Sequence, residues 1–197
     1  MSLTERRKAA TQLEIARAAA ALFAERGSDG TTAEAIADRA GVSLRTFYRY
    51  FRIKQDAVAP LLNFGARRWQ QNLAGTPHDV PLPEALEQAA RRAMTVRDAD
   101  DAESLEWARG LLRAAADDPA LRTVWATVNQ DSEHELLPLL AERTGAEPTD
   151  LQVRLTAAAA TTAIRVAVET WAAMDADPPE PADIAVRCMR DLTAGLW

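Results

Sequence analysis

The sequence predicts an all-α chain of about nine helices. Alanine dominates the composition and only eight of the 197 residues are glycine, which favours helix over irregular structure. No run of alternating β-branched residues is long enough to form a strand. Prolines and glycine-containing turns divide the chain into segments of helical length.

The segment 31–56 is predicted to form two short helices joined by a tight turn. Thr31 is the expected N-cap of the first helix, and Glu34 completes a capping box. Gly41 suits the left-handed conformation that ends a helix, and Ser43 is the expected N-cap of the next one. The first helix has one apolar face, formed by Ala33, Ile36, Ala37 and Ala40.

The second of these short helices has two chemically different sides. Phe47, Tyr50 and Phe51 recur at i, i+3 and i+4, so they are expected to pack inward. The opposite, outward side carries two arginines, a tyrosine and a leucine. Arginine can make paired hydrogen bonds to guanine, and an apolar side chain can contact the methyl group of thymine. The pattern therefore predicts a DNA-binding helix-turn-helix; the alternative is a helical hairpin with a solvated basic face. The outward side carries Leu44, Arg45, Tyr48 and Arg49.

Charge is distributed unevenly along the chain. Residues 1–55 contain ten Lys or Arg and six acidic residues, a net charge of +4, whereas the rest contains 13 basic and 23 acidic residues, a net charge of −10. A basic head can contact phosphate while an acidic body faces solvent. The basic tract 6–8 is either a solvated terminus or an arm that contacts phosphates or the minor groove.

Six further helices are expected in the remainder of the chain. Pro60 is tolerable only near the start of the first of these, and Pro138 should kink or break the fourth. Thr149 is the expected N-cap of the long penultimate helix. The predicted ranges are 54–73, 83–98, 119–144, 150–174 and 183–196, with a proline-rich turn at 175–181. Between 98 and 119 a further helix is expected to end near 116, and the acidic run 98–103 is either a connection or the first turn of that helix.

The N-terminal pattern resembles the DNA-binding domain of the TetR family of bacterial transcriptional regulators. The matching stretches are IARAAAALFAERG at 15–27, TTAEAIADRAGVS at 31–43 and TFYRYF at 46–51, followed by Lys54. The resemblance covers about a quarter of the chain. It implies a helix-turn-helix domain over residues 1–52 and a helical effector-binding and dimerisation domain over residues 53–197.

The resemblance also implies roles for individual residues. Arg45 becomes the main candidate for a base contact, and Arg49 could reach either phosphate or base. Ile53 stands where the family usually has a capping serine, so a cap worth about 1 kcal/mol is either missing or supplied elsewhere. Leu44 replaces a basic or polar residue, which predicts a preference for thymine at one operator position. The residues implied at DNA are Thr31, Thr32, Tyr48 and Lys54 on phosphates, and Ser43, Leu44, Arg45 and Thr46 in the major groove.

The last two predicted helices are rich in small residues, which allow helices to approach closely. These helices pack within the chain or, as the resemblance implies, pair with their copies in a homodimer. A two-fold dimer predicts an operator that is an inverted repeat.

The middle helices should hold a regulatory cavity. Arg165 and Glu169 lie one turn apart in an otherwise apolar helix, so they either pair with each other or line that cavity. The body weakly resembles regulators associated with mycofactocin and acyl-CoA sensing, which suggests a hydrophobic or acyl-CoA-like effector. The candidate pocket residues are Trp69, Trp107, Arg109, Trp125, Asn129, Arg165 and Glu169.

No cofactor, metal site or catalytic motif is predicted. The two histidines lie far apart, no nucleotide-binding or zinc-binding motif is present, and no apolar stretch is long enough for a membrane span. The single Cys188 fits a reducing cytoplasm. The expected function is a repressor that a small molecule releases from its operator. The alternatives are an activator or ligand-corepressed regulator, and an all-helical carrier or enzyme with no DNA role.

Overall fold

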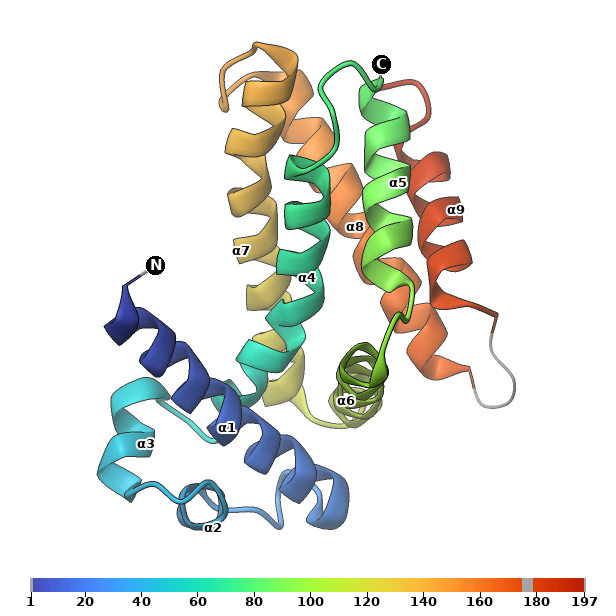
Figure 1. The fold of residues 1–197 in the computed structure, drawn as a ribbon. Coiled ribbons are helices and arrows are strands. Elements are labelled where there is room, and N and C mark those ends of the chain that lie inside the picture. Colours follow the sequence, from blue (N-terminus) through green and yellow to red (C-terminus); the bar gives the residue numbers. More distant parts are fainter. Residues whose placement is uncertain (1, 175–178, 197) are drawn as a thin grey trace. The chain divides into compact units, whose positions relative to one another are not determined.

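The computed structural model describes residues 2–174 and 179–196, and those residues form nine α-helices and one short 3-10 helix (Figure 1). The all-α prediction is confirmed. The chain forms two compact units. The first comprises Met1–Asn63 and Glu103–Ala126, and the second comprises Phe64–Ala102 and Thr127–Trp197.

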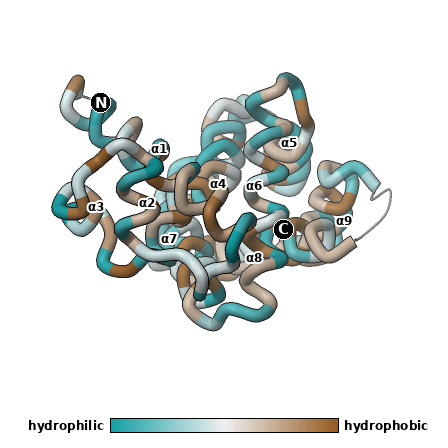
Figure 2. Tube along the Cα trace, turned by 90° about the horizontal axis from the view of Figure 1, so that it is seen from below, coloured by the Kyte–Doolittle hydropathy of each residue, from teal (hydrophilic) through white to brown (hydrophobic). Residues whose placement is uncertain are grey.

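The first unit is built around the N-terminal helices α1 (Leu3–Arg26), α2 (Ala33–Arg39) and α3 (Leu44–Tyr50). Helix α2 packs against both α1 and α3, and the 3-10 helix η1 (Gln55–Val58) packs against α1. The core of this unit consists of fully buried side chains that include Ile15, Ile36, Phe47 and Val58. Hydrophobic and hydrophilic residues follow one another along α2 and α3 (Figure 2), as expected for short helices with one buried face.

Helix α1 begins at the very start of the described chain. The Ser2 hydroxyl accepts a hydrogen bond from the Glu5 backbone N–H (3.2 Å), and the Glu5 carboxylate accepts one from the Ser2 N–H (2.6 Å). This reciprocal capping box satisfies backbone donors that a helix start leaves free. The basic tract 6–8 consequently lies inside a helix rather than in an extended arm.

The N-cap predicted for α2 is wrong by one residue. Thr32, not Thr31, caps the helix, because its hydroxyl accepts from the Ala35 N–H at 3.1 Å. The Thr31 side chain is buried, and its hydroxyl donates to the carbonyls of Leu22 (3.2 Å) and Gly27 (2.9 Å). Thr31 thus ties the turn to the end of α1, which leaves the capping position to its neighbour.

The sequence predicts that the helix after the helix-turn-helix begins at Lys54. In the structure η1 comes first, and α4 (Ala59–Ala74) begins after it. Lys54 lies at the N-cap of η1 and makes no side-chain capping bond there. The Ile53 N–H donates instead to the Asp56 carboxylate at 3.3 Å. Pro60 lies in the first turn of α4, where its missing N–H costs no helical hydrogen bond.

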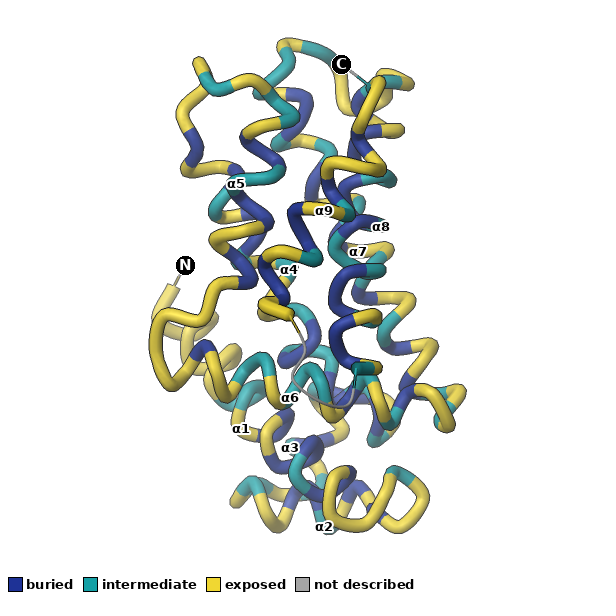
Figure 3. The backbone as a smooth tube through the Cα atoms, turned by 90° about the vertical axis from the view of Figure 1, so that its right-hand side faces the viewer, coloured by how far each residue is buried: buried dark blue, intermediate teal, exposed yellow. Residues whose placement is uncertain are grey.

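The second unit contains α5 (Leu82–Met94), α8 (Leu151–Ala173) and α9 (Pro181–Thr193). Helix α9 packs against both α5 and α8. Buried and exposed residues alternate along these helices (Figure 3). Small side chains dominate the buried positions, which include Ala85, Ala89, Ala160, Ala163 and Ala185, so the helix axes can approach closely.

Two other helices each contribute residues to both units. Helix α6 (Ala99–Ala115) begins within the acidic run 98–103 and ends, as predicted, near residue 116, and helix α7 (Pro119–Thr144) is continuous. Of the two predicted outcomes at Pro138, a break is wrong, since that residue lies inside the continuous α7, and a kink stays a prediction. Leu136 and Leu140 on either side of it are fully buried, and this packing outweighs the single backbone hydrogen bond that proline removes.

The predicted boundaries of three further helices are corrected. Helix α5 ends at Met94 rather than near residue 98, and α9 begins at Pro181 and ends at Thr193. Helix α8 is capped by Asp150 rather than Thr149, because the Asp150 carboxylate accepts from the Gln152 N–H at 2.8 Å. In the proline-rich turn expected at 175–181, residues 175–178 lie outside the described part of the chain.

The Arg143 side chain, near the end of α7, holds the connection between α4 and α5. Arg143 donates to the carbonyls of Thr76 (2.9 Å), Pro77 (2.7 Å) and Val80 (2.7 Å) in the connection between α4 and α5. These carbonyls lie outside the helices and lack intrahelical partners, so the bonds fix the connection between α4 and α5. Among the residues described, no helix is both long and apolar enough to span a membrane.

Candidate DNA-binding site

The turn between α2 and α3 is closed by backbone hydrogen bonds. Gly41 has a φ of 66°, a conformation that side chains with a Cβ rarely adopt. Its N–H donates to the Asp38 carbonyl at 3.1 Å, and the Val42 N–H donates to the Ala37 carbonyl at 3.0 Å. The predicted helix-ending glycine is confirmed, and the bonds set the direction in which α3 leaves the turn.

Helix α3 begins at a side-chain cap, as predicted. The Ser43 hydroxyl accepts from the Thr46 N–H at 3.1 Å and lies 2.9 Å from the Thr46 hydroxyl. The cap satisfies a backbone donor at the start of a helix only seven residues long. Because so short a helix has little intrinsic stability, this cap and the packing of its inner face hold α3 in place.

Replacing Ser43 by Ala should lower the free energy of unfolding by about 1 kcal/mol, because the cap at the start of α3 is lost. Chemical denaturation followed by circular dichroism at the helical band measures this change. Ser43→Asn is the matched control, since asparagine caps as well as serine. Equal losses in both variants would show that the cap contributes nothing.

The inner face of α3 is aromatic. Phe47 is fully buried; its ring makes an edge-to-face contact with Tyr48 (5.4 Å between centroids) and a tilted contact with Phe51 (5.6 Å). Phe51 is buried, whereas Tyr50 is only half-buried. Two of the three residues predicted to pack inward therefore form the core, and Tyr50 lies at its edge.

The outer face of α3 presents the side chains predicted for it. Arg45 and Arg49 are exposed and Tyr48 is 54% exposed. Leu44 and Thr46 are half-buried, so Leu44 projects less than expected. Within the described residues, no ion pair involves Arg45 or Arg49, so their charge is available to an anionic partner.

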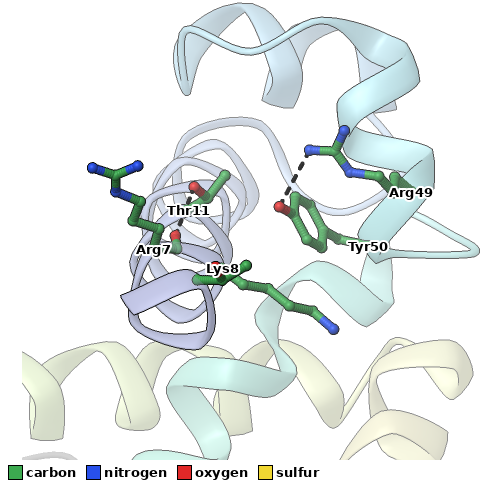
Figure 4. Close-up of a pocket in the computed structure, with 6 residues that line it drawn as sticks. Arg7, Lys8, Thr11, Arg49 and Tyr50 are labelled. Atoms are coloured by element: carbon green, nitrogen blue, oxygen red, sulfur yellow. Dashed lines mark hydrogen bonds between the residues drawn. The ribbon is translucent and has the colours of Figure 1, made fainter. Parts of the chain in front are cut away.

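Arg49 is held toward the end of α3 by its neighbour. Its Nη2 donates to the Tyr50 hydroxyl at 3.2 Å, and its guanidinium carbon lies 4.8 Å from the centre of the Tyr50 ring (Figure 4). A cation over an aromatic face is attracted by the ring quadrupole. The Arg49 guanidinium is thereby held against the Tyr50 ring.

Lys54 links the end of the helix-turn-helix to its beginning. Its Nζ donates to the Thr31 carbonyl at 2.8 Å. Thr32 is exposed beside it, while Thr31 faces inward. Close by in the chain, the Gln55 side chain donates to the Ser28 hydroxyl at 3.0 Å. The structure therefore brings Thr32 and Lys54 together at one end of α2.

The candidate effector residues are divided between the two units. Trp107, Arg109 and Trp125 belong to the first unit, whereas Trp69 and Asn129 belong to the second. Trp69 is almost completely buried. Trp107 and Trp125 are half-buried, and the Trp107 indole N–H donates to Glu103 at 3.2 Å. Their role in a pocket stays a prediction.

Arg165 and Glu169 of α8 are paired. An Arg165 guanidinium nitrogen lies 2.9 Å from a Glu169 carboxylate oxygen, and both side chains are 38% exposed. Arg109 lies with a guanidinium nitrogen 4.0 Å from the Glu106 carboxylate, and its side chain is largely covered. The first alternative for Arg165 and Glu169, mutual pairing, is therefore observed in this conformation.

One cluster of residues was missed by sequence reasoning. Thr4 and Thr11 of α1 lie with Arg7 and Lys8 around a surface pocket that Arg49 and Tyr50 complete (Figure 4). The four α1 residues follow the spacing i, i+3, i+4 and i+7, which places them on one helix face. That spacing was the available signal; the contribution of α3 required the structure.

A capped helix-turn-helix with arginine and tyrosine on its outward face, attached to a helical body, defines a DNA-binding regulator. Matches to models of protein families show to which family of regulators the chain belongs. Residues 15–59 match the model described as bacterial regulatory proteins, tetR family, and residues 80–197 match the MftR C-terminal domain. The chain belongs to the TetR family of transcriptional regulators, with a C-terminal domain of MftR type. Regulators of this family are not enzymes.

Solved structures share the fold along almost the whole chain. A protein from Syntrophomonas wolfei described as a TetR-family regulator has a TM-score of 0.66 and 19% identity over 95% of this chain and 96% of its own. A similar protein from a Rhodococcus species has a TM-score of 0.60 and 19% identity, with 93% and 98% covered. The Thermus thermophilus repressor FadR, in complex with lauroyl-CoA, has a TM-score of 0.57 and 22% identity, with 94% and 95% covered. A comparison with curated proteins found no match.

Proposed function

We propose that this chain is a ligand-responsive repressor that binds an inverted-repeat operator as a homodimer and leaves it when a small molecule binds. The observation that carries the proposal is the outward face of α3, where Arg45, Tyr48 and Arg49 are exposed without a carboxylate partner in the described chain. The domain at residues 1–52, together with Lys54 just beyond it, would contact DNA, and the domain at residues 53–197 would bind the effector and the second subunit.

The proposed contacts with DNA follow from where the side chains lie. Arg45 is exposed in the first turn of α3, where a helix inserted in the major groove reaches base edges. Tyr48, Thr32 and Lys54 would contact phosphate. Thr31 is assigned a supporting role, because its hydroxyl is buried and its carbonyl accepts from Lys54. Ser43, Leu44 and Thr46 would lie beside Arg45 in the groove.

The homodimer is proposed to form through α8 and α9. Leu151 and Leu155 are exposed one turn apart on α8, and Leu192 is exposed on α9. Large apolar side chains that remain exposed on neighbouring helices favour a partner surface, and most oligomers of one chain are two-fold dimers. Two reading heads on one operator account for an inverted repeat.

The effector is proposed to be hydrophobic or acyl-CoA-like. One finding supports this class: the structurally similar FadR is in complex with lauroyl-CoA. In this chain three of the seven candidate pocket residues are tryptophans, whose indole rings suit an apolar ligand. The cationic Arg109 and Arg165 are the candidates for contact with an anionic group on such a ligand.

Release would operate through a shift between conformations. Helix α4 contributes Ala59–Asn63 to the first unit and continues into the second unit, so a change in one unit has a covalent helical route to the other. A ligand that prefers a conformation unsuited to the operator lowers DNA affinity, and DNA lowers ligand affinity by the same factor.

Selection of random duplexes on the purified chain tests the proposal. We expect an enriched inverted repeat whose affinity falls steeply with salt, because phosphate contacts release counterions. Adding acyl-CoA esters of increasing chain length should then weaken binding to that duplex. Tighter binding with ligand would instead indicate a corepressed regulator. An unenriched pool at low salt, with and without ligand, would contradict the proposal.

Replacing Tyr48 by Phe should weaken operator binding about two- to tenfold, because one hydrogen bond to phosphate is lost. The phenylalanine ring can keep the edge-to-face contact with Phe47. Fluorescence anisotropy with the operator and with single-base variants measures the effect, which should be equal for every duplex because phosphate contacts carry no sequence information. Loss confined to one base position would place Tyr48 at a base edge.

A further inference from the structure

The N-terminal turns of α1 and the end of α3 together line a surface pocket in the first unit (Figure 4). Its lining contains three cationic side chains, three hydroxyl groups and no carboxylate. This composition suits a multivalent oxyanion, since each cation and hydroxyl can donate to a separate oxygen. The lining residues are Thr4, Arg7, Lys8, Thr11, Arg49 and Tyr50.

The pocket is built on fixed structure rather than on loose side chains alone. The capping box of Ser2 and Glu5 starts the helix ahead of it. The Thr11 hydroxyl donates to the Arg7 carbonyl at 3.0 Å, and Tyr50 holds the Arg49 guanidinium through a hydrogen bond and a ring contact. Arg49 is thereby oriented before any ligand arrives, which reduces the entropy lost on binding.

The cations of this pocket are not neutralised within the described chain. No ion pair involves Arg7, Lys8 or Arg49 there. Other arginines of the same unit differ, since Arg17 pairs with Glu14 at 3.3 Å and Arg39 pairs with Glu25 at 2.7 Å. Three uncompensated cations around one hollow make a local positive potential that attracts an anion.

The position of the pocket indicates the source of that anion. Helix α3 has seven residues, so it is roughly 10 Å long, and the major groove of B-DNA is about 12 Å wide. A recognition helix contacts base edges with its N-terminal residues, so its last turn lies farther from the bases and nearer to the sugar-phosphate strand that borders the groove. Arg49 and Tyr50 belong to that last turn, and α1 adds Arg7 and Lys8 to them.

We infer that this pocket binds a backbone phosphate of duplex DNA next to the segment that α3 reads. The inference rests on the proposed function and extends it to α1. It assigns Arg49 to phosphate rather than to a base, and it gives the basic tract a role as part of a helix. The site strengthens binding to every sequence equally and shifts no base preference.

The salt dependence of DNA binding tests the site. Each phosphate contact contributes about one unit to the slope of log affinity against log salt. Arg7→Ala and Lys8→Ala should each reduce the slope by about one unit between roughly 50 and 200 mM salt, with an unchanged preference among duplexes. Arg6→Ala is the matched control: it removes the same charge from the same turn, and Arg6 does not line the pocket. We expect its slope to change by less than half as much.

A second measurement locates the phosphate. Operator duplexes can carry a neutral methylphosphonate at single backbone positions. At one flanking position, this change should lower the affinity of the wild-type chain. It should not lower the affinity of Arg7→Ala any further there, because the two changes remove the same contact. Tyr50→Phe should lower affinity without changing the chain's charge, because Arg49 loses its hydrogen bond to the Tyr50 hydroxyl and keeps only the ring contact. Circular dichroism checks that each variant remains folded.

Three results would overturn the inference. Equal salt slopes for the Arg6, Arg7 and Lys8 variants would mean that the loss of affinity reflects net positive charge and not a specific phosphate site. Additive losses at every methylphosphonate position would mean that no single phosphate is bound. If pyrophosphate binds the wild-type chain but does not compete with DNA, the pocket binds a free anion from solution and not a phosphate of DNA. Failure of the proposed function is distinct, since the wild-type chain would then prefer no duplex, and the same slope comparison on a random duplex would still decide the pocket.

Discussion

Replacing Asp101 by Asn is expected to lower the free energy of unfolding by about 3 kcal/mol. The Asp101 carboxylate forms an ion pair with Arg68 in the second unit, and the two side chains are only 5% and 12% exposed. Arg68 also donates to the Thr95 carbonyl at 2.8 Å. Removing one member of a buried pair leaves the other charge without compensation, and this residual charge accounts for most of the cost.

Asp183→Asn is the matched control for this variant. Asp183 forms an ion pair with Arg91 at 3.0 Å, but the side chains are 64% and 53% exposed. Exposed pairs contribute about 0–1 kcal/mol because water screens them. Chemical denaturation of both variants at one protein concentration makes the comparison. A loss for Asp101→Asn no larger than that for Asp183→Asn would mean that the Arg68 pair behaves as a surface pair.

The contribution of Asp101 should also depend on pH. The pKa of Asp101 is lowered by the hydrogen bond from the Arg97 side chain, by the Arg97 backbone N–H and by the charges of Arg68 and Arg97, against the opposing effect of burial. A lowered pKa stabilises the fold at pH values above the unfolded value near 3.9, and that stability is lost as pH falls through the folded pKa. The difference between wild type and Asp101→Asn should therefore be constant near neutral pH and shrink below about pH 4. A difference that grows on acidification would contradict this assignment.

The helix-turn-helix could be predicted from sequence because local interactions determine it. Gly41 needs a left-handed backbone, Ser43 caps the helix that follows, and Phe47 packs on residues one turn away. Each of these depends on neighbours within a few positions. The cap of α2 could not be assigned in the same way. Thr31 and Thr32 are both able to cap, and only the carbonyls of α1 that accept from Thr31 distinguish them.

The remaining features depend on contacts that sequence patterns do not reveal. The Arg68–Asp101 pair joins residues far apart in the chain. Pro138 signals a break, but the packing of α7 overrides it. In the candidate site, the helical spacing of Thr4 and Lys8 indicates one face of α1, whereas the fold alone places Arg49 beside that face.

Replacing Arg45 by Ala is expected to cost about 1–3 kcal/mol of operator binding, equivalent to a loss of roughly 5- to 150-fold. Arg45 is exposed in the first turn of α3, and no ion pair holds it within the described chain. A guanidinium that bonds two acceptors on guanine discriminates against other bases. The variant should therefore lose its preference at one position of each half-site and keep it elsewhere.

Two further variants separate base reading from charge. Arg52→Ala removes the same charge from an exposed residue just beyond α3, so it should weaken all duplexes alike. Arg45→Lys keeps the charge but lacks the planar fork of donors, so it should retain most of the salt slope and still lose the preference for one base. Duplex selection on the three variants measures both quantities. If Arg45→Ala returns the same operator profile as the wild-type chain, Arg45 contacts the backbone, and base recognition must come from Leu44, Thr46 or the shape of the duplex.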